Sequence, residues 1–216
     1  MPARILYRLP DNLTFEQGAF VEPVSIAVHA VERTPIHVGD TAVVVGSGMI
    51  GLLCAQALRA VGCGQIIAVD LDDSRLEKAV QLGADEGLRA DDPDVIAAIQ
   101  DRTDGRGADV VFEVVGIAPT VKMSVNSVRK GGQVTLVGNL AANIDFPLQA
   151  VVTREITLNG SCGSQGEYDA CLDLIARGKI NVNALLSGVA PLADGASWFN
   201  RLYEGEAGLL KIMLQP

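Results

Sequence analysis

The sequence predicts an α/β protein built on a Rossmann-type, doubly wound parallel sheet of six strands, together with part of a second domain. The first observation is that short β-branched runs alternate with segments of helical apolar spacing, which favours parallel strands with right-handed crossovers. The second is the glycine turn GSGMIG at residues 46–51, set between a strand and a helix. The third is Asp70, an acid that ends the next strand roughly 20 residues after the turn.

The first forty residues predict a loop-rich beginning and one helix. Residues 4–8 resemble a short strand, and Thr14 can cap a short turn that follows it. A helix over residues 22–31 opens on glutamate and proline, since proline suits a first helical turn and an acid there complements the helix dipole. His29 lies in this helix among apolar residues, and we expect it to be packed.

One strand–turn–helix–strand unit organises the rest of the chain. Residues 41–45 are a β-branched strand, and residues 65–69 are a second apolar strand closed by Asp70. Between them runs a helix that is stopped by Gly62 and Gly64. Its apolar positions recur at helical spacing and are Ile50, Leu53, Cys54, Ala57, Leu58 and Val61.

The same alternation continues to the end of the chain. Pro147 makes residues 144–146 an edge strand, because proline cannot donate to a strand ladder. The expected helices are residues 72–82, 94–102, 121–129 (stopped by the glycines at 131–132), 166–177 and 196–203. The remaining expected strands are residues 83–88 with their turn, 108–115, 133–137, 144–146, 155–158, 185–191 and 209–214.

Each glycine of the turn has a role that a dinucleotide requires. Gly46 permits the sharp turn, Gly48 lets a pyrophosphate approach the backbone, and Gly51 lets the helix pack close to the strand. The free N–H groups and the positive end of the helix dipole then face the phosphates. The alternative is that these glycines serve only packing, but their place between a strand and a helix favours a dinucleotide.

Asp70 also predicts which dinucleotide binds. Its carboxylate can accept hydrogen bonds from both hydroxyls of an adenosine ribose, whereas a 2′-phosphate would meet a like charge. At about 4 Å and an effective dielectric near 20, that repulsion is about 4 kcal/mol per charge pair, which favours NAD over NADP. Arg75 leaves two interpretations open: it softens the repulsion or lies against the adenine, or it is a solvated helix residue beside Asp72 and Asp73.

Composition argues against several classes of function. The chain has 216 residues, is 49% hydrophobic, and carries a formal net charge of −9 with 4% aromatic residues, which makes nucleic acid or an anionic membrane a poor partner. No apolar run is long enough to span a bilayer, and the first ten residues contain no secretory signal. Four cysteines stand singly, which predicts free thiols in a reducing, cytoplasmic compartment, and two histidines cannot make a His-rich metal site.

Two further strand ends fall at the edge of the sheet where ligands bind. Val115 and Gly116 end one strand, and Val137, Gly138 and Asn139 end the next. Ligands of such sheets lie outside the carboxyl ends of the strands, so these residues can line the nicotinamide half of a cofactor site. Glycines that only make turns are an equally good interpretation of the sequence.

Five runs of the sequence carry a family resemblance. They are LPDNLTFEQGAFVEPVSIAVHAV, VGDTAVVVGSGMIGLL, IIAVDLDDSRLEKAVQLGAD, GGQVTLVGN and REITLNGS. They resemble the medium-chain zinc-dependent alcohol dehydrogenases, and most of all the polyol (sorbitol-like) and threonine dehydrogenase branch. The resemblance covers nearly the whole chain but corresponds to the later part of such an enzyme, without the N-terminal catalytic domain whose cysteine and His–Glu pair hold the catalytic zinc.

The resemblance implies three parts and a set of site residues. Residues 1–24 would be a remnant of the catalytic domain, residues 25–163 the NAD-binding Rossmann domain, and residues 164–216 a segment that returns to the catalytic domain. Motif and resemblance together predict that the cofactor is bound by Gly46, Gly48, Met49, Ile50, Gly51, Asp70, Arg75, Val115, Val137, Gly138, Asn139, Ser161 and Cys162. Gly163 stands where the family often has a bulky or basic residue, so this sequence departs from the pattern there.

Glu22 is the one candidate for catalysis and for metal binding. It falls where this branch places an acid at, or one water from, the catalytic zinc, although composition alone would make it only a helix-start acid. A catalytic zinc needs about three protein ligands. We therefore expect an incomplete site that does not bind zinc tightly, although the complete enzyme would use the metal.

The resulting hypothesis is the NAD-binding portion of a zinc-dependent dehydrogenase that transfers a hydride between an alcohol or polyol and NAD, inactive as this chain alone. The alternatives are a zinc-free quinone- or enoyl-type reductase, a non-catalytic NAD-binding module, and an S-adenosylmethionine methyltransferase. Asp70 and the Glu22-Pro23 run argue against the first, whose members usually prefer NADP. Gly51 argues against the last, whose turn is usually GxGxG. Residues 144–147 predict a homodimer, joined edge to edge, or a higher homo-oligomer.

Overall fold

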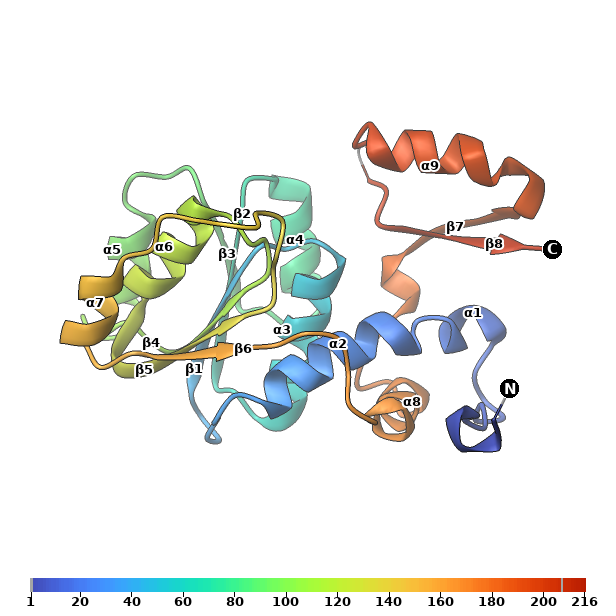
Figure 1. Ribbon diagram of the computed structural model, residues 1–216, viewed down its shortest axis with the longest axis horizontal. Coiled ribbons are helices and arrows are strands. Elements are labelled where there is room, and N and C mark those ends of the chain that lie inside the picture. Colours follow the sequence, from blue (N-terminus) through green and yellow to red (C-terminus); the bar gives the residue numbers. More distant parts are fainter. Residues whose placement is uncertain (1, 207) are drawn as a thin grey trace.

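A central parallel sheet organises the molecule (Figure 1). The computed structural model of the chain describes residues 2–206 and 208–216. Six strands stand in the order β3-β2-β1-β4-β5-β6, and each neighbouring pair is parallel. They are β1 (Thr41–Val45), β2 (Gln65–Asp70), β3 (Glu86–Arg89), β4 (Ala108–Glu113), β5 (Val128–Leu136) and β6 (Thr157–Gly160). This order confirms the predicted doubly wound, Rossmann-type sheet.

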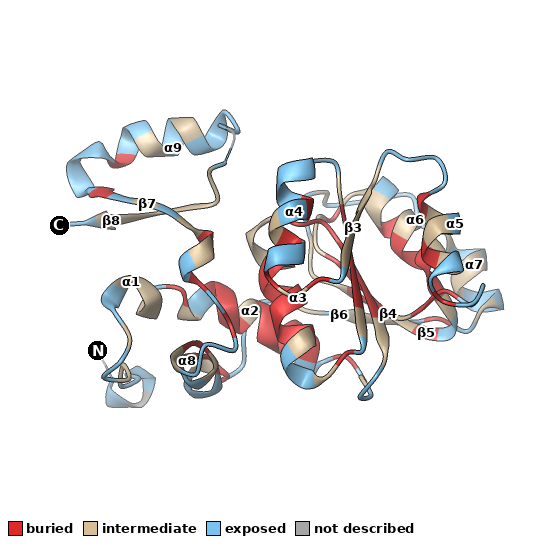
Figure 2. Ribbon diagram, turned by 180° about the vertical axis from the view of Figure 1, so that it is seen from behind, coloured by how far each residue is buried: buried red, intermediate tan, exposed pale blue. Residues whose placement is uncertain are grey.

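Alternate side chains of the central strand face opposite layers of helices. Ala42 and Val44 pack with one layer, whereas Val43 and Val45 pack with the other. The first layer holds α2 (Val21–Glu32), α3 (Met49–Val61), α4 (Asp73–Gln81) and α8 (Tyr168–Ala176), and the second holds α5 (Val95–Asp101), α6 (Ala118–Ser127) and α7 (Leu148–Thr153). Buried residues gather in the sheet and in the helices against it (Figure 2), as expected of a parallel sheet covered on both faces.

The N-terminal segment is not the strand that the sequence predicts at residues 4–8. Ala3–Ile5 form a 3-10 helix (η1), in which the Ile5 N–H donates to the carbonyl oxygen of Pro2 at 3.2 Å. The prediction was wrong because this segment pairs with no other strand in the part of the chain that the structure describes, and an unpaired strand leaves its backbone groups unsatisfied. The predicted cap is confirmed, since Thr14 and Gln17 bond reciprocally at the start of α1 (Phe15–Gly18).

The boundary between α6 and β5 lies earlier than predicted. The helix occupies Ala118–Ser127 rather than residues 121–129, and β5 starts at Val128 and runs through both glycines. A register shift in the pairing with β4 occurs at this point. A Cβ on Gly132 would lie 2.9 Å from the carbonyl oxygen of Asp109, so only glycine lets the two strands approach. The glycine pair marks an irregularity within a strand and does not stop the helix.

The predicted edge strand at residues 144–146 is a loop. It leads into α7, which the sequence did not reveal, and Pro147 occupies the N-cap position of that helix. The edge of the sheet is instead β6, which begins two residues later than the predicted strand at 155–158. Proline is at home both at a helix start and on an edge strand, and the sequence signal could not separate the two.

The C-terminal residues form a second, smaller unit. β7 (Leu186–Pro191) and β8 (Lys211–Gln215) pair in parallel. The helix α9 (Gly195–Tyr203) connects them, and the short 3-10 turns η2 (Asn183–Leu185) and η3 (Leu192–Asp194) flank β7 (Figure 1). Several of its large apolar side chains are exposed, among them Phe199 at 74% and Leu192 at 60%. In the described residues, no helix has both the length and the apolar character needed to cross a bilayer.

Candidate functional site

A cleft of about 900 Å³ opens at the carboxyl ends of the strands, where sheets of this type bind their ligands. Its walls come from the ends of β1, β2, β4, β5 and β6, from α2 and from the start of α3. The predicted residues that line it are Gly46, Gly48, Ile50, Asp70, Arg75, Val115, Val137, Gly138, Asn139, Ser161 and Cys162. Met49 and Gly51, also predicted, lie in the first turn of α3 but outside this lining.

The glycine turn has the geometry that its sequence requires. Gly46 has a left-handed φ of 102°, and a Cβ there would lie 2.7 Å from Cγ2 of Val115. A Cβ on Gly51 would overlap with the carbonyl oxygen of Gly46, so this glycine allows α3 to begin directly against the turn. Gly48 differs, because a Cβ there would meet no atom within 4 Å and would project into open space. The absent side chain of Gly48 therefore leaves room for a ligand.

The N-terminus of α3 faces the cleft without a side-chain cap. Gly48 is the N-cap residue and provides no side-chain hydrogen bond to the first turn. The first N–H groups of this helix and its dipole therefore remain directed toward the cleft, which suits an anion. The hydroxyl oxygen of Ser47 is buried and has no hydrogen-bond partner among the described residues, so a polar ligand atom can satisfy it.

Asp70 stands beside the turn and is bonded to it. Its Oδ2 accepts the N–H of Ser47 at 2.6 Å, and its Oδ1 accepts the N–H of Asp72 at 3.0 Å. The side chain is only 10% exposed. The sequence predicted an acid facing the ligand, and the structure adds that this acid also holds the backbone of the turn. Each oxygen keeps a lone pair for a further donor.

Arg75 lines the cleft next to Asp70, where it can reach a ligand. It is also a half-exposed helix residue beside Asp72, so the structure has features of both interpretations that the sequence left open. Its Nη1 lies 3.9 Å from Oδ1 of Asp70, and its Nε lies 3.9 Å from Oδ2 of Asp72. The side chain is 47% exposed. We call Gly46, Gly48, Asp70 and Arg75 the turn end of the cleft.

Glu113 shapes the middle of the cleft, a role that sequence reasoning missed. This fully buried side chain ends β4, and its Oε1 accepts bonds from the N–H groups of Val115 and Gly116 and from the hydroxyl of Thr120. The same backbone turn lies so close to the next strand end that a Cβ on Gly138 would overlap with Gly116. Both strand-end glycines therefore make tight turns, and Gly138 also lines the cleft. A buried acid in an otherwise apolar strand, FEVV, was the available signal.

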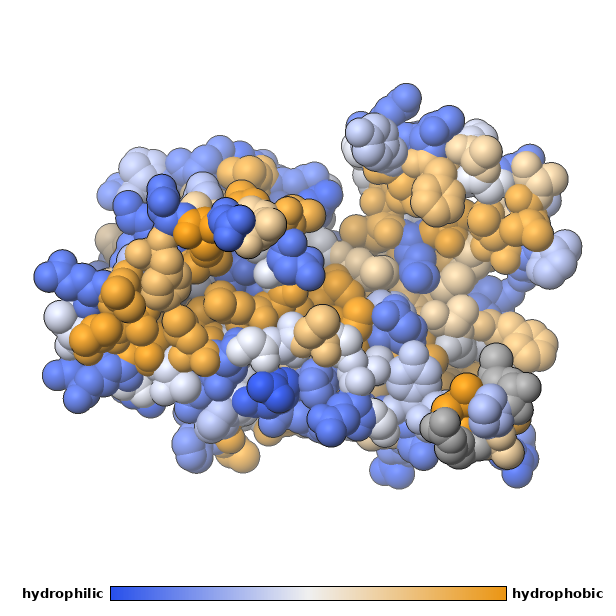
Figure 3. All heavy atoms as spheres, viewed as in Figure 1, coloured by the Kyte–Doolittle hydropathy of each residue, from blue (hydrophilic) through white to orange (hydrophobic). Residues whose placement is uncertain are grey.

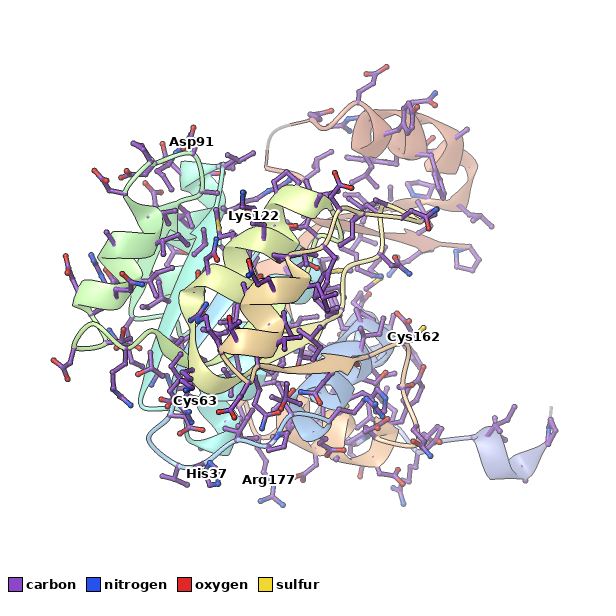
Figure 4. The ribbon with its side chains drawn as sticks, turned by 60° about the vertical axis from the view of Figure 1, so that its left-hand side comes forward. His37, Cys63, Asp91, Lys122, Cys162 and Arg177 are labelled. Carbon is purple, nitrogen blue, oxygen red and sulfur yellow. The ribbon has the colours of Figure 1, made fainter. Side chains whose placement is uncertain are left out.

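The other end of the cleft joins α2 to the segment after β6. We call His29, Arg33, Gly160, Ser161 and Cys162 the loop end. Cys162 lies just beyond β6 (Figure 4), and Ser161 has a buried hydroxyl oxygen without a partner among the described residues. Sequence reasoning missed the contribution of α2, where Ile26, His29 and Arg33 line the cleft. Their spacing of three and four places them on one helix face and was the signal available.

The predicted metal ligand does not lie in a metal site of the described residues. Glu22 is exposed in the first turn of α2 and is not part of the cleft lining. Burial and the nearby charge of Glu22 raise the pKa of Tyr168. Within residues 2–206 and 208–216, no three His, Cys, Asp or Glu side chains are grouped so that they could hold a metal ion.

The cysteines divide into inert and accessible thiols. Cys54, Cys63 and Cys171 are buried, and Cys162 is exposed. Burial raises the pKa of Cys54 to about 12, of Cys63 to about 11 and of Cys171 to about 12. Because the thiolate is the reactive form, these three buried thiols are expected to be unreactive in the folded protein.

A dinucleotide fits this arrangement of groups. The uncapped helix start and the missing Cβ of Gly48 suit a pyrophosphate, and Asp70 has acceptor capacity for ribose hydroxyls. Of the two unpartnered serine hydroxyls, that of Ser161 belongs to a residue that lines the cleft, whereas that of Ser47 is buried within the glycine turn. Catalytic zinc does not fit the described residues, because they offer no set of three ligands.

Comparison with known proteins places this chain among dehydrogenases. The sequence profile described as zinc-binding dehydrogenase matches residues 50–177. D-xylulose reductase A of Aspergillus niger is 33% identical over 214 residues, a match that covers 95% of this chain and 59% of the reductase. The chain thus spans about three fifths of the length of the curated relatives it matches.

Solved structures share the fold over nearly all of the chain. The crystal structure of 2R,3R-butanediol dehydrogenase from Bacillus subtilis has a TM-score of 0.90 at 34% identity, covering 97% of this chain and 60% of that one. A protein from Sinorhizobium meliloti 1021, described as a zinc-binding dehydrogenase and solved with NADP bound, has a TM-score of 0.90 at 28% identity. That match covers 97% of this chain and 62% of the other.

Proposed function

We propose, from the premise that this chain belongs to the zinc-binding dehydrogenase family, that it is the NAD-binding part of an enzyme that transfers a hydride between an alcohol or polyol and NAD. The observation that carries the proposal is the turn end of the cleft, where an uncapped helix start and the Asp70 carboxylate lie side by side. The names of the relatives, a xylulose reductase and a butanediol dehydrogenase, support an alcohol or polyol as the substrate.

The residues of this chain hold and orient the cofactor. The N–H groups at the start of α3 bind the pyrophosphate, and Asp70 accepts hydrogen bonds from the adenosine ribose. Val115, Val137, Gly138 and Asn139 form the wall between the two ends of the cleft. When bound, the nicotinamide ring supplies the hydride acceptor. Residues 1–24, 25–163 and 164–216 divide, in this proposal, into catalytic remnant, NAD-binding domain and returning segment.

NAD rather than NADP is the proposed dinucleotide. The Sinorhizobium meliloti relative was solved with NADP, so family membership does not decide between the two. Asp70 supports NAD, because its carboxylate is only 10% exposed and would face a 2′-phosphate of like charge. The half-exposed Arg75, whose Nη1 lies 3.9 Å from Oδ1 of Asp70, is a cation that would soften this repulsion. A titration of the protein with NADH and NADPH tests this, with tighter binding of NADH expected and equal binding contradicting it.

Glu22 is proposed to contribute one ligand, directly or through a water, to a zinc site that the described residues cannot complete. We derive no step through the metal. Calorimetry of the chain with zinc is expected to give no tight binding, since three ligands are needed and one is offered. Tight binding that Glu22→Gln leaves unchanged would contradict the proposed role of Glu22.

A homodimer is proposed at the edge of the sheet formed by β6, in place of residues 144–147, which form no strand. Large apolar side chains near this edge are exposed, namely Leu140 at 78%, Leu148 at 65% and Val152 at 65%. Figure 3 shows apolar atoms gathered on this part of the surface. Pairing of two β6 edges would cover them. Light scattering should give twice the monomer mass, and Val152→Glu should give the monomer.

The free thiols support a reducing, cytoplasmic location.

The direct test of the proposal is NADH binding by this chain. Wild-type protein is expected to bind NADH and to leave alcohols unoxidised, since residues 2–206 and 208–216 offer no complete metal site. Asp70→Ala should weaken NADH binding by about tenfold, which is the loss of one or two hydrogen bonds to a charged acceptor. Equal affinity of wild type and variant for NADH would overturn the assignment of the turn end.

A further inference from the structure

The segment after β6 has little support of its own at the loop end of the cleft. Residues 162–166 are exposed, and Gly163 and Gly166 have left-handed φ values of 65° and 97°. Glycine backbone can adopt many conformations. Ser161 and Cys162 nevertheless line the cleft, so their position depends on groups outside the loop.

Helix α2 holds this loop at both of its ends. Before the loop, Nε of Arg33 donates to the carbonyl oxygen of Gly160 at 2.8 Å. After the loop, Nδ1 of His29 lies 2.6 Å from Oε1 of Glu167, the residue at the N-cap of α8. The helix is a firm support, because most of its apolar residues are buried in the core. A helix packed in the core thus brackets an exposed loop.

The His29–Glu167 contact is buried and directional. The two side chains are 10% and 7% exposed, and Oε2 of Glu167 also accepts the N–H of Gln165, inside the loop, at 2.5 Å. Burial raises the pKa of the Glu167 carboxyl, but hydrogen bonds from the N–H groups of Gln165 and Glu167 and from His29 outweigh burial and lower the pKa overall. The ionised carboxylate therefore accepts the N–H of His29 Nδ1.

We propose that His29 and Glu167 are positioning residues that fix the loop of residues 161–166 against the nicotinamide end of the bound dinucleotide. The inference rests on the proposed function and adds two residues to its site. The Glu167 carboxylate accepts one hydrogen bond from the loop, at Gln165, and one from α2, at His29. His29 itself lines the cleft. The pair lies at the loop end, so it acts on the nicotinamide half and leaves the ADP-ribose half to the turn end.

The experiment compares NADH with ADP-ribose, which lacks the nicotinamide, on four proteins. His29→Leu removes the donor, and His29→Asn returns an N–H near the position of Nδ1. His37→Leu is the matched control, because His37 is 84% exposed and lies outside the cleft. Calorimetry gives both affinities, and the fluorescence of reduced nicotinamide reports on that end of the ligand alone.

The expected result is a selective loss of NADH affinity. His29→Leu should bind NADH about tenfold more weakly, as the loss of one charge-assisted hydrogen bond predicts, with ADP-ribose affinity unchanged within about twofold. His29→Asn should recover most of the loss, and His37→Leu should match wild type. If His29→Leu does not fold, Glu167→Gln, which keeps an acceptor but not the charge, should show the same selectivity.

The outcomes separate the two proposals. If wild type binds NADH and the variants lose neither affinity nor nicotinamide fluorescence, or lose NADH and ADP-ribose equally, the positioning role is wrong and the proposed function stands. If wild type binds neither NADH nor ADP-ribose, the proposed function fails and the positioning role falls with it.

Discussion

The two ends of the cleft are built in different ways. The turn end comes from one continuous stretch, residues 45–75, in which strand, turn, helix and acid follow each other. The loop end joins α2, β6 and the start of α8, and its His29–Glu167 contact bridges 138 positions in sequence. Local backbone geometry therefore suffices to define the first end, whereas the second exists only when the whole sheet has formed around it.

The largest expected effect concerns the turn end. Gly51→Val should lower the free energy of unfolding by about 4 kcal/mol, because its Cβ would overlap with the Gly46 carbonyl and its branches would press on the turn. Gly48→Ala is the control, expected within about 1 kcal/mol of wild type since no atom lies within 4 Å of the added Cβ. Urea denaturation measures both, and equal stabilities would mean that local geometry does not define this end.

A smaller effect is expected where the two ends meet. Glu113→Ala removes an acceptor for three hydrogen bonds and should cost about 3 kcal/mol of unfolding free energy. Thr120→Val removes one of those bonds together with the bonds between the Thr120 hydroxyl and the backbone of Ile117, and should cost less, about 1–2 kcal/mol. Denaturation curves of the two variants check the ratio. A loss no larger for Glu113→Ala than for Thr120→Val would show that the strand ends do not depend on this carboxylate.

The two ends of the cleft should also differ in their effect on the preference for NADH over NADPH. Asp70→Asn should reduce the ratio of NADH to NADPH affinity by about tenfold, because the negative charge is lost while one oxygen can still accept a backbone N–H. His29→Asn, at the loop end, should leave that ratio unchanged. Paired titrations with both dinucleotides give the ratios, and a shift in the His29 variant alone would reverse the assignment of the two ends.

This difference also explains how much of the site could be predicted from the sequence. The strands at Thr41–Val45 and Gln65–Asp70, the turn and the acid were all predicted correctly, because glycine spacing and β-branched runs report local backbone geometry. His29 was expected to be packed, and it is buried. Its partner could not be predicted, since nothing local to position 29 indicates an acid so distant in the chain.

The errors in the fold have the same origin. Residues 144–146 were predicted as a strand because proline alone cannot distinguish an edge strand from a helix start. The glycines at 131–132 were predicted to stop a helix, but close approach to β4 places them within β5. In both cases the deciding information is which segments become neighbours, and a local pattern does not contain it.

The smallest expected effect is a pH dependence at the loop end. Because the pKa of Glu167 lies below its usual value of 4.5 in the folded protein, ionised Glu167 stabilises the fold above about pH 4.5, and this contribution is lost as pH falls through the folded pKa. Glu167→Gln should therefore be less stable than wild type by about 1 kcal/mol at pH 7, with the gap closing at lower pH. Denaturation of both proteins between pH 7 and pH 3 measures the gap. The exposed Glu77→Gln serves as the control and is expected to match wild type at pH 7. A Glu167 gap that stays constant or widens on acidification would mean that the charge of Glu167 does not support the loop end.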